Sequence, residues 1–142
     1  GILSISAEAN LGATPSSVTA SSITINGGTL QATATLSLSS NRGITLSSAG
    51  GLAATSGNTL TVAGVMTGSS ALTINGASQT GTVILSGTNT YTGSTTITGG
   101  ILSISAEANL GATPSSVTAS SITINGGTLQ ATATLSLSSN RG

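Results

Sequence analysis

Charged side chains, which carry much of the chemistry of enzymes, are almost absent from this 142-residue sequence. The four that occur are Glu8, Arg42, Glu107 and Arg141, and the chain has no Asp, Lys, His or Cys. A glycosidase usually places two carboxylates across the bond that it cleaves, and a lyase needs a strong base or a metal held by carboxylates. Glu8 and Glu107 are therefore the only pair that could support either reaction.

One complete repeat unit separates these two glutamates. Residues 1–43 recur letter for letter as residues 100–142, an offset of 99 residues. We interpret residues 1–142 as a single segment, with a repeat unit at 1–99 and a partial identical second copy at 100–142. If the unit forms four or five stacked coils of a solenoid, with strands about 4.8 Å apart, the glutamates lie about 20 Å apart. That distance is too long for a catalytic pair, so we predict no enzymatic activity and no catalytic residues.

Binding chemistry is equally sparse in the sequence. Calcium sites gather several carboxylate oxygens, and none cluster here, so we predict no metal-binding and no cofactor-binding residues. We expect Glu8 to be a solvated loop acid and Arg42 a turn cation, with pairing between neighbouring filaments as the alternative. Tyr91 either contacts a sugar by stacking or, as we expect, packs on the coil below it. A net charge of zero provides no electrostatic field that would attract the phosphates of nucleic acid, so we predict no nucleic-acid partner.

Short strands separated by turns rich in Gly and Asn make up most of the chain. From Leu30 to Leu38 apolar and polar residues alternate, which predicts a half-buried strand. Residues 6–12 depart from this pattern and could form one helical turn inside a loop, with Ser6 as its cap and Gly12 as its end. Shorter strands are expected at 23–25, 44–46, 60–62, 72–74 and 83–85.

The tandem identity selects among the all-β folds that such strands could form. A closed sandwich or barrel cannot be lengthened by 99 identical residues, whereas a solenoid can, because each coil contacts only its neighbours. With roughly 20 to 30 residues per coil, one unit holds four or five coils and advances roughly 20 to 24 Å. Crossovers between parallel strands are nearly always right-handed. The sequence therefore predicts a right-handed parallel β-helix, or β-solenoid.

Residues 85–102 closely resemble the autotransporter-associated β-strand repeat. The shared signature is a Ser-Gly pair, an Asn-Thr-Tyr-Thr-Gly turn, a Thr-Thr strand and a Gly-Gly pair before an apolar strand. The loop Ala9-Asn10-Leu11-Gly12 also resembles the segment that follows this signature in family members. The resemblance covers roughly residues 82–112. It implies the passenger region of a large bacterial surface protein, folded as a right-handed β-helix and exported across the outer membrane.

These observations favour a structural role over catalysis. We expect a stalk, fibre or filament at the extracellular or outer-membrane surface of a bacterium, with end-to-end self-association by strand addition. The alternative is an adhesin passenger that binds glycans or host or neighbouring cells. Pairs such as Thr33 and Thr35 leave ice binding as a remote third interpretation. No run of about 18 apolar residues occurs, so we predict no membrane insertion by this segment.

Overall fold

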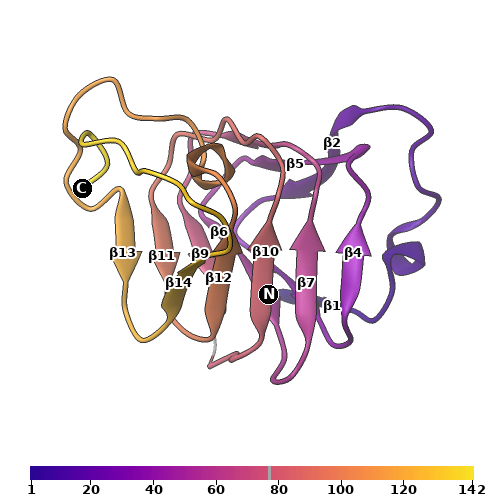
Figure 1. Ribbon diagram of the computed structural model, residues 1–142. Helices are drawn as coiled ribbons and strands as arrows, with labels where there is room; N and C mark the ends of the chain where they lie inside the picture. Colours follow the sequence, from indigo (N-terminus) through magenta and orange to yellow (C-terminus); the bar gives the residue numbers. More distant parts are fainter. Residues whose placement is uncertain (77) are drawn as a thin grey trace.

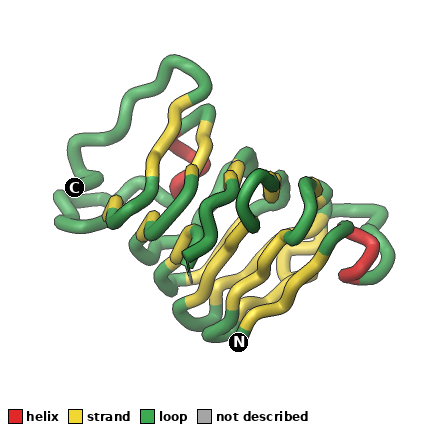
Figure 2. Tube along the Cα trace, turned by 90° about the horizontal axis from the view of Figure 1, so that it is seen from below, coloured by secondary structure: helices red, strands yellow, loops and turns green. Residues whose placement is uncertain are grey.

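Three parallel β-sheets wrap around one axis in the computed structural model, which describes residues 1–76 and 78–142. In the two central coils, residues 29–46 and 50–68, the strands lie in the six-stranded, five-stranded and three-stranded sheets in turn, so one passage through the three faces makes one coil. In the other coils, one of the three faces carries a turn or loop in place of a strand. The coils stack from the indigo N-terminal part to the yellow C-terminal part of the chain in Figure 1, and Figure 2 shows the same stack from below. Every strand pair is parallel, which confirms the predicted parallel β-solenoid. Its right-handedness stays a prediction.

The strands are short and grouped by sheet. The six-stranded sheet contains β1 (Ile2–Ile5), β3 (Thr29–Ala32), β6 (Gly50–Ala54), β9 (Leu72–Ile74), β11 (Thr95–Ile97) and β13 (Ile122–Ile124). The five-stranded sheet contains β14 (Thr128–Ala131), β12 (Ile101–Ile104), β10 (Thr82–Leu85), β7 (Thr59–Val62) and β4 (Leu36–Leu38). The three-stranded sheet contains β2 (Thr19–Ile25), β5 (Arg42–Leu46) and β8 (Met66–Gly68). Two 3-10 helices, η1 (Glu8–Leu11) and η2 (Glu107–Leu110), interrupt the coils.

Strand register gives the length of each coil. In the six-stranded sheet, partner residues on successive strands are 27, 22, 22, 23 and 27 residues apart. These values confirm the expected 20 to 30 residues per coil. The two longest coils are those that contain η1 and η2 with the loops that follow them.

The core is a thin column of aliphatic side chains along the axis. Inward-facing residues stack strand on strand, as in the ladder Leu30, Leu52, Ile74 and Ile97. Each of these four side chains is buried, while Thr73 and Thr96, one residue along, point outward and are partly exposed. Successive coils therefore share one apolar interior, which is what the alternating pattern predicted.

The predicted strand from Leu30 to Leu38 is wrong as a single element. β3 ends at Ala32 and β4 begins at Leu36, because the chain turns a corner between two sheets at residues 33–35. Thr33 holds the corner: its backbone N–H donates to the Ile5 carbonyl at 2.8 Å and its hydroxyl donates to the same oxygen at 3.2 Å. The apolar alternation continues through the corner, so the pattern alone does not reveal it.

The two copies of the repeated sequence occupy different sheets. β1 lies in the six-stranded sheet, whereas β12, which has the same sequence, lies in the five-stranded sheet. Residues 23–25 and 122–124 are likewise displaced, from the three-stranded to the six-stranded sheet. Both shifts are one step along the order in which the chain visits the sheets. A unit of 99 residues therefore spans four coils and one additional face.

Candidate functional site: the coil junction

The side chains with chemical character gather where one coil passes to the next, in an arrangement we call the coil junction. It comprises the segment 87–95 between β10 and β11, the turn 105–112 that contains η2, and Arg141. The three parts belong to adjacent coils and lie against one another through side-chain to backbone hydrogen bonds. The described residues include no cluster of three or more metal-ligating side chains.

Asn89 connects three coils from a buried position. Its Oδ1 accepts a hydrogen bond from the Met66 N–H at 2.8 Å, on the coil below. Its Nδ2 donates to the Asn109 carbonyl at 2.7 Å, and its backbone N–H donates to the Ala108 carbonyl at 2.9 Å, both on the coil above. All polar atoms of this side chain are thus used to satisfy backbone groups that water cannot reach.

Asn109 completes the same network from the other side. Its Oδ1 accepts from the N–H groups of Ser105 and Ala106, both at 2.9 Å, and so closes the start of η2. Its Nδ2 donates to the Gly87 carbonyl at 3.0 Å. In the first copy, Asn10 makes the same two bonds to backbone N–H groups, to Ser6 and Ala7, but is exposed. The predicted turn at 6–12 is therefore a 3-10 helix capped by Asn10 and Ala7 rather than by Ser6.

Tyr91 is buried between coils, so the sugar-stacking hypothesis is wrong and the packing interpretation is confirmed. Its backbone N–H donates to the Met66 carbonyl on the coil below at 3.2 Å, and its carbonyl accepts from Ala112 on the coil above at 2.9 Å. The hydroxyl lies 2.9 Å from Thr95 Oγ1. Burial raises the pKa of Tyr91. The ring also lies close to Gly111, where an added Cβ would come within 3.0 Å of it.

The charged residues form two equivalent intrachain clamps, one in each copy of the repeat. Arg141 Nε lies 3.2 Å from Glu107 Oε1, and Arg42 Nε lies 3.0 Å from Glu8 Oε1. The remaining arginine nitrogens donate to carbonyls of the 3-10 turn, for example Arg141 Nη1 to Leu110 at 3.0 Å. Each arginine is only 3% exposed. Arg42 is therefore a buried residue at the start of β5 rather than a turn cation, and Glu8 is a partly exposed, paired acid rather than a solvated one. Pairing between neighbouring filaments stays a prediction.

Both glutamates are held in the ionised form. The Ser138 backbone N–H, 2.9 Å from Glu107 Oε1, lowers the pKa of Glu107; burial opposes this effect and Arg141 reinforces it. For Glu8, burial acts to raise the pKa, but the Ser39 N–H and Arg42 together outweigh it and leave the pKa below its ordinary value. The clamp is thus a charged pair at neutral pH rather than a neutral hydrogen bond.

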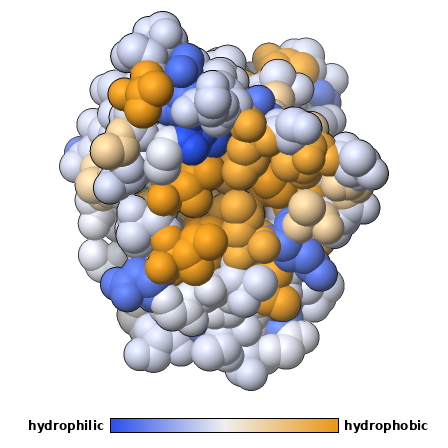
Figure 3. Space-filling model, turned by 60° about the vertical axis from the view of Figure 1, so that its left-hand side comes forward, coloured by the Kyte–Doolittle hydropathy of each residue, from blue (hydrophilic) through white to orange (hydrophobic). Residues whose placement is uncertain are grey.

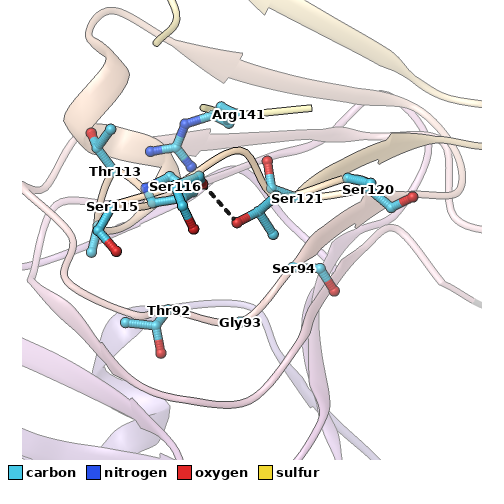
Figure 4. Close-up of a pocket in the computed structure, with 13 residues that line it drawn as sticks. Thr92, Gly93, Ser94, Thr113, Ser115, Ser116, Ser120, Ser121 and Arg141 are labelled. Carbon is cyan, nitrogen blue, oxygen red and sulfur yellow. Dashed lines mark hydrogen bonds between the residues drawn. The ribbon is translucent and has the colours of Figure 1, made fainter. Parts of the chain in front are cut away.

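A polar hollow of about 580 Å³ lies beside the junction, between residues 92–94 and the loop at 112–121 (Figure 4). Hydroxyl groups dominate its lining, supplied by Thr92, Ser94, Thr113, Ser115, Ser116, Thr118, Ser120 and Ser121. Thr118 Oγ1 donates to the Ser116 carbonyl at 3.0 Å across its rim. Arg141 also lines the hollow, but its guanidinium is bound to Glu107 and to the carbonyls of Leu110 and Gly111. The side-chain groups that face the hollow are therefore mainly hydroxyls.

Sequence reasoning missed the buried asparagines. A third one, Asn75, accepts from the Ala54 N–H at 2.9 Å and donates to the Gly81 carbonyl at 2.7 Å. The sequence places Asn75 and Asn89 in turns, and their interior role depends on partners more than 20 residues away. Nothing in the sequence distinguishes these three from the other six asparagines of the chain, since of the three only Asn75 directly follows a strand.

Fold and junction together define a class: a tandemly repeated parallel β-solenoid whose coils are locked at their turns by buried polar side chains. Within it, residues 77–104 match the family model of the passenger-associated-transport-repeat, a repeat of the autotransporter type. The match covers about a fifth of the chain, includes Asn89 and Tyr91, and confirms the resemblance. A repeat of this kind indicates a secreted or surface bacterial protein. No curated protein and no solved structure matches the chain significantly.

Proposed function

We propose that this chain is a structural spacer: a rod-like segment of a large bacterial surface or extracellular protein, whose length is set by the number of repeat units. The observation that carries the proposal is that two copies of one sequence build the same local structure inside one continuous solenoid. The pairing of Ile2 with Thr29 recurs as Ile101 with Thr128, and the clamp of Glu8 with Arg42 recurs as Glu107 with Arg141. The β10–β12 pairing crosses the repeat boundary without a break.

A spacer role fits the chemistry of the site better than catalysis does. Each glutamate accepts from an arginine and a backbone N–H through its Oε1, and its lowered pKa keeps it ionised at neutral pH, which suits it poorly to act as a general acid. The junction side chains serve backbone groups of neighbouring coils, which is a structural task. The adhesin alternative, binding to glycans or cells, stays a prediction.

Rod length as a function of repeat number tests this proposal. Chains carrying one, two or three additional 99-residue units should lengthen by about 21 Å per unit at constant width, because four and one-third coils are spaced about 4.8 Å apart. Small-angle X-ray scattering and negative-stain electron microscopy would measure this. A matched control carries an added segment of the same composition in scrambled order. Particles that grow in all directions with added units would overturn the spacer proposal.

A further inference from the structure

Three Asn-Gly dipeptides occur in the chain, at Asn26-Gly27, Asn75-Gly76 and Asn125-Gly126. Asn-Gly is the dipeptide most prone to deamidation, because glycine has no side chain to hinder the attack of its nitrogen on the asparagine amide. The six other asparagines of the chain precede the larger residues Leu, Arg or Thr. Whether each Asn-Gly reacts therefore depends on how the fold holds it.

The fold locks Asn75 between coils. Its side chain is fully buried, its Oδ1 accepts from the Ala54 N–H at 2.9 Å, and its Nδ2 donates to the Gly81 and Gly99 carbonyls at 2.7 and 3.2 Å. Attack on this amide would break these three hydrogen bonds, and the resulting carboxylate would face two carbonyl oxygens. Asn75 should therefore react only when the coils around it open.

Asn26 and Asn125, which occupy the same position in the two copies, are held differently. Both side chains are exposed, and neither makes a hydrogen bond to any residue that the structure describes. Within the described part of the chain, the N–H groups of Gly27 and Gly126 are also unbonded, so the attacking nitrogens are available. Both glycines have positive φ angles, +79° and +97°, and lie in turns at corners between two sheets.

The exposure of this corner persists beside either neighbouring coil. Asn26 follows β2, which pairs with β5 on the coil above, and Asn125 follows β13, which pairs with β11 on the coil below. Each of the two neighbours is thus present in one copy of the repeat, and the asparagine is exposed in both copies. Neither neighbour covers the turn.

We propose that Asn26 and Asn125 are sites of spontaneous deamidation and that Asn75 is protected. The glycine nitrogen attacks the asparagine Cγ and forms a new C–N bond, its proton passes to the side-chain nitrogen, and the bond from Cγ to Nδ2 breaks as ammonia leaves. Water then opens the resulting succinimide at either carbonyl and gives aspartate or isoaspartate. Each event consumes one water and releases one ammonia, so water is the only co-reactant.

The product changes the charge of a neutral chain. Each conversion adds one carboxylate to a net charge of zero, and both arginines are already bound to a glutamate and to backbone carbonyls. On the face drawn in Figure 3, strongly hydrophilic residues, in blue, form only small separate areas. The solenoid would thus gain one unpaired negative charge per repeat unit with age, and neighbouring copies would begin to repel one another. This inference goes beyond the spacer role and does not require it.

Incubation of the intact 142-residue chain in neutral buffer, folded or in urea, tests the proposal. Samples are denatured and digested, and mass spectrometry of the peptides assigns each deamidated asparagine. In urea, all three Asn-Gly sites should react at similar rates. In the folded chain, Asn26 and Asn125 should stay close to those rates, while Asn75 should react at least about tenfold more slowly, because its reaction waits for local opening.

Two results of this experiment would overturn the proposal. One is protection of either Asn26 or Asn125 to the level of Asn75 in the folded chain. The other is reaction of Asn75 in the folded chain at its rate in urea.

The double variant Asn26→Gln/Asn125→Gln is the matched control for the charge change. Gln keeps a neutral amide but cyclises far more slowly, because a larger ring must form. Both positions are exposed, so circular dichroism should show the variant folded. On isoelectric focusing, the parent chain should develop two more acidic bands during incubation and the double variant neither.

Acidic bands in the double variant, or none in the parent chain, would refute the deamidation sites. Neither readout depends on the length of the solenoid, so the spacer proposal stands or falls separately.

Discussion

At the scale of residues, the chain concentrates its charge in two clamps. Glu8 and Glu107 are its only side-chain carboxyls, and each accepts from a backbone N–H and from an arginine. A buried arginine left without its partner is costly, which ties each clamp to the fold of its coil. The sequence did not predict the pairing, because the partners are 34 residues apart and meet only when two coils stack.

The lowered pKa values of both glutamates predict acid sensitivity. A carboxyl whose pKa is lower in the folded chain leaves more protons bound to the unfolded chain, so stability rises with pH in that window. The contribution is complete above the ordinary value of 4.5 and disappears as the pH falls through the lower, folded values. We expect the melting temperature to be flat from about pH 6 to 8 and to fall below about pH 4.5.

The double variant Glu8→Gln/Glu107→Gln is the control for this prediction. It should be less stable at neutral pH and should lose most of the acid dependence, as thermal melts followed by circular dichroism would show. An unchanged fall in melting temperature between pH 5 and 3, in the absence of both side-chain carboxyls, would contradict it.

Gly12 and Gly111 offer a second residue-scale prediction, because they share sequence and backbone conformation but not surroundings. Their φ angles are +85° and +84°, a region that costs other residues about 1–3 kcal/mol. An added Cβ meets nothing within 4 Å at Gly12, but lies 2.4 Å from the Tyr91 carbonyl oxygen at Gly111. Gly111→Ala should therefore destabilise the chain clearly more than Gly12→Ala in urea denaturation. Equal losses would show that the junction is not closely packed.

At the scale of elements, strands and core were largely predictable and corners were not. Alternation located β7, β9 and β10 to within a residue and identified their buried faces, because one face of each strand meets the axis. The same alternation predicted one strand where the structure has two, β3 and β4, because a corner between two faces preserves the alternation of buried and exposed side chains. The buried asparagines resemble turn formers in the sequence for a related reason: Asn is common in turns, and only neighbouring coils show whether it is enclosed.

A comparison of Asn10 with Asn109 measures how much the coil beneath a turn adds to the stability of that turn. Asn109→Ala removes the partner of the buried Gly87 carbonyl and of two N–H groups, and each buried group left unpaired costs about 1–3 kcal/mol. Asn10→Ala removes bonds in an exposed turn, where water replaces them, so its cost should be well below that of Asn109→Ala. Hydrogen exchange at Ala106 and Ala7 would locate the effect. Equal protection losses at both sites would contradict the prediction.

At the scale of the whole molecule, the exact repeat was sufficient to predict a parallel solenoid, and the family match to residues 77–104 supports the same conclusion. The rotation by one face per unit was not predictable. The coils measure 27, 22, 22, 23 and 27 residues, and although the longest ones contain η1 and η2, the sequence does not mark where each coil closes. Only the strand register shows it. The four or five coils expected per unit bracket the observed four and one-third, and the fraction is what moves the second copy to a different sheet.

The clamps also determine how the proposed spacer would behave in its surroundings. Since all four charged side chains neutralise one another at short range, the exterior presents hydroxyls and amides with almost no electric field. Added salt has little to screen on such a surface, so solubility should vary little between fresh water and brine. Parallel rods would also meet without mutual repulsion, because a net charge near zero permits close lateral approach.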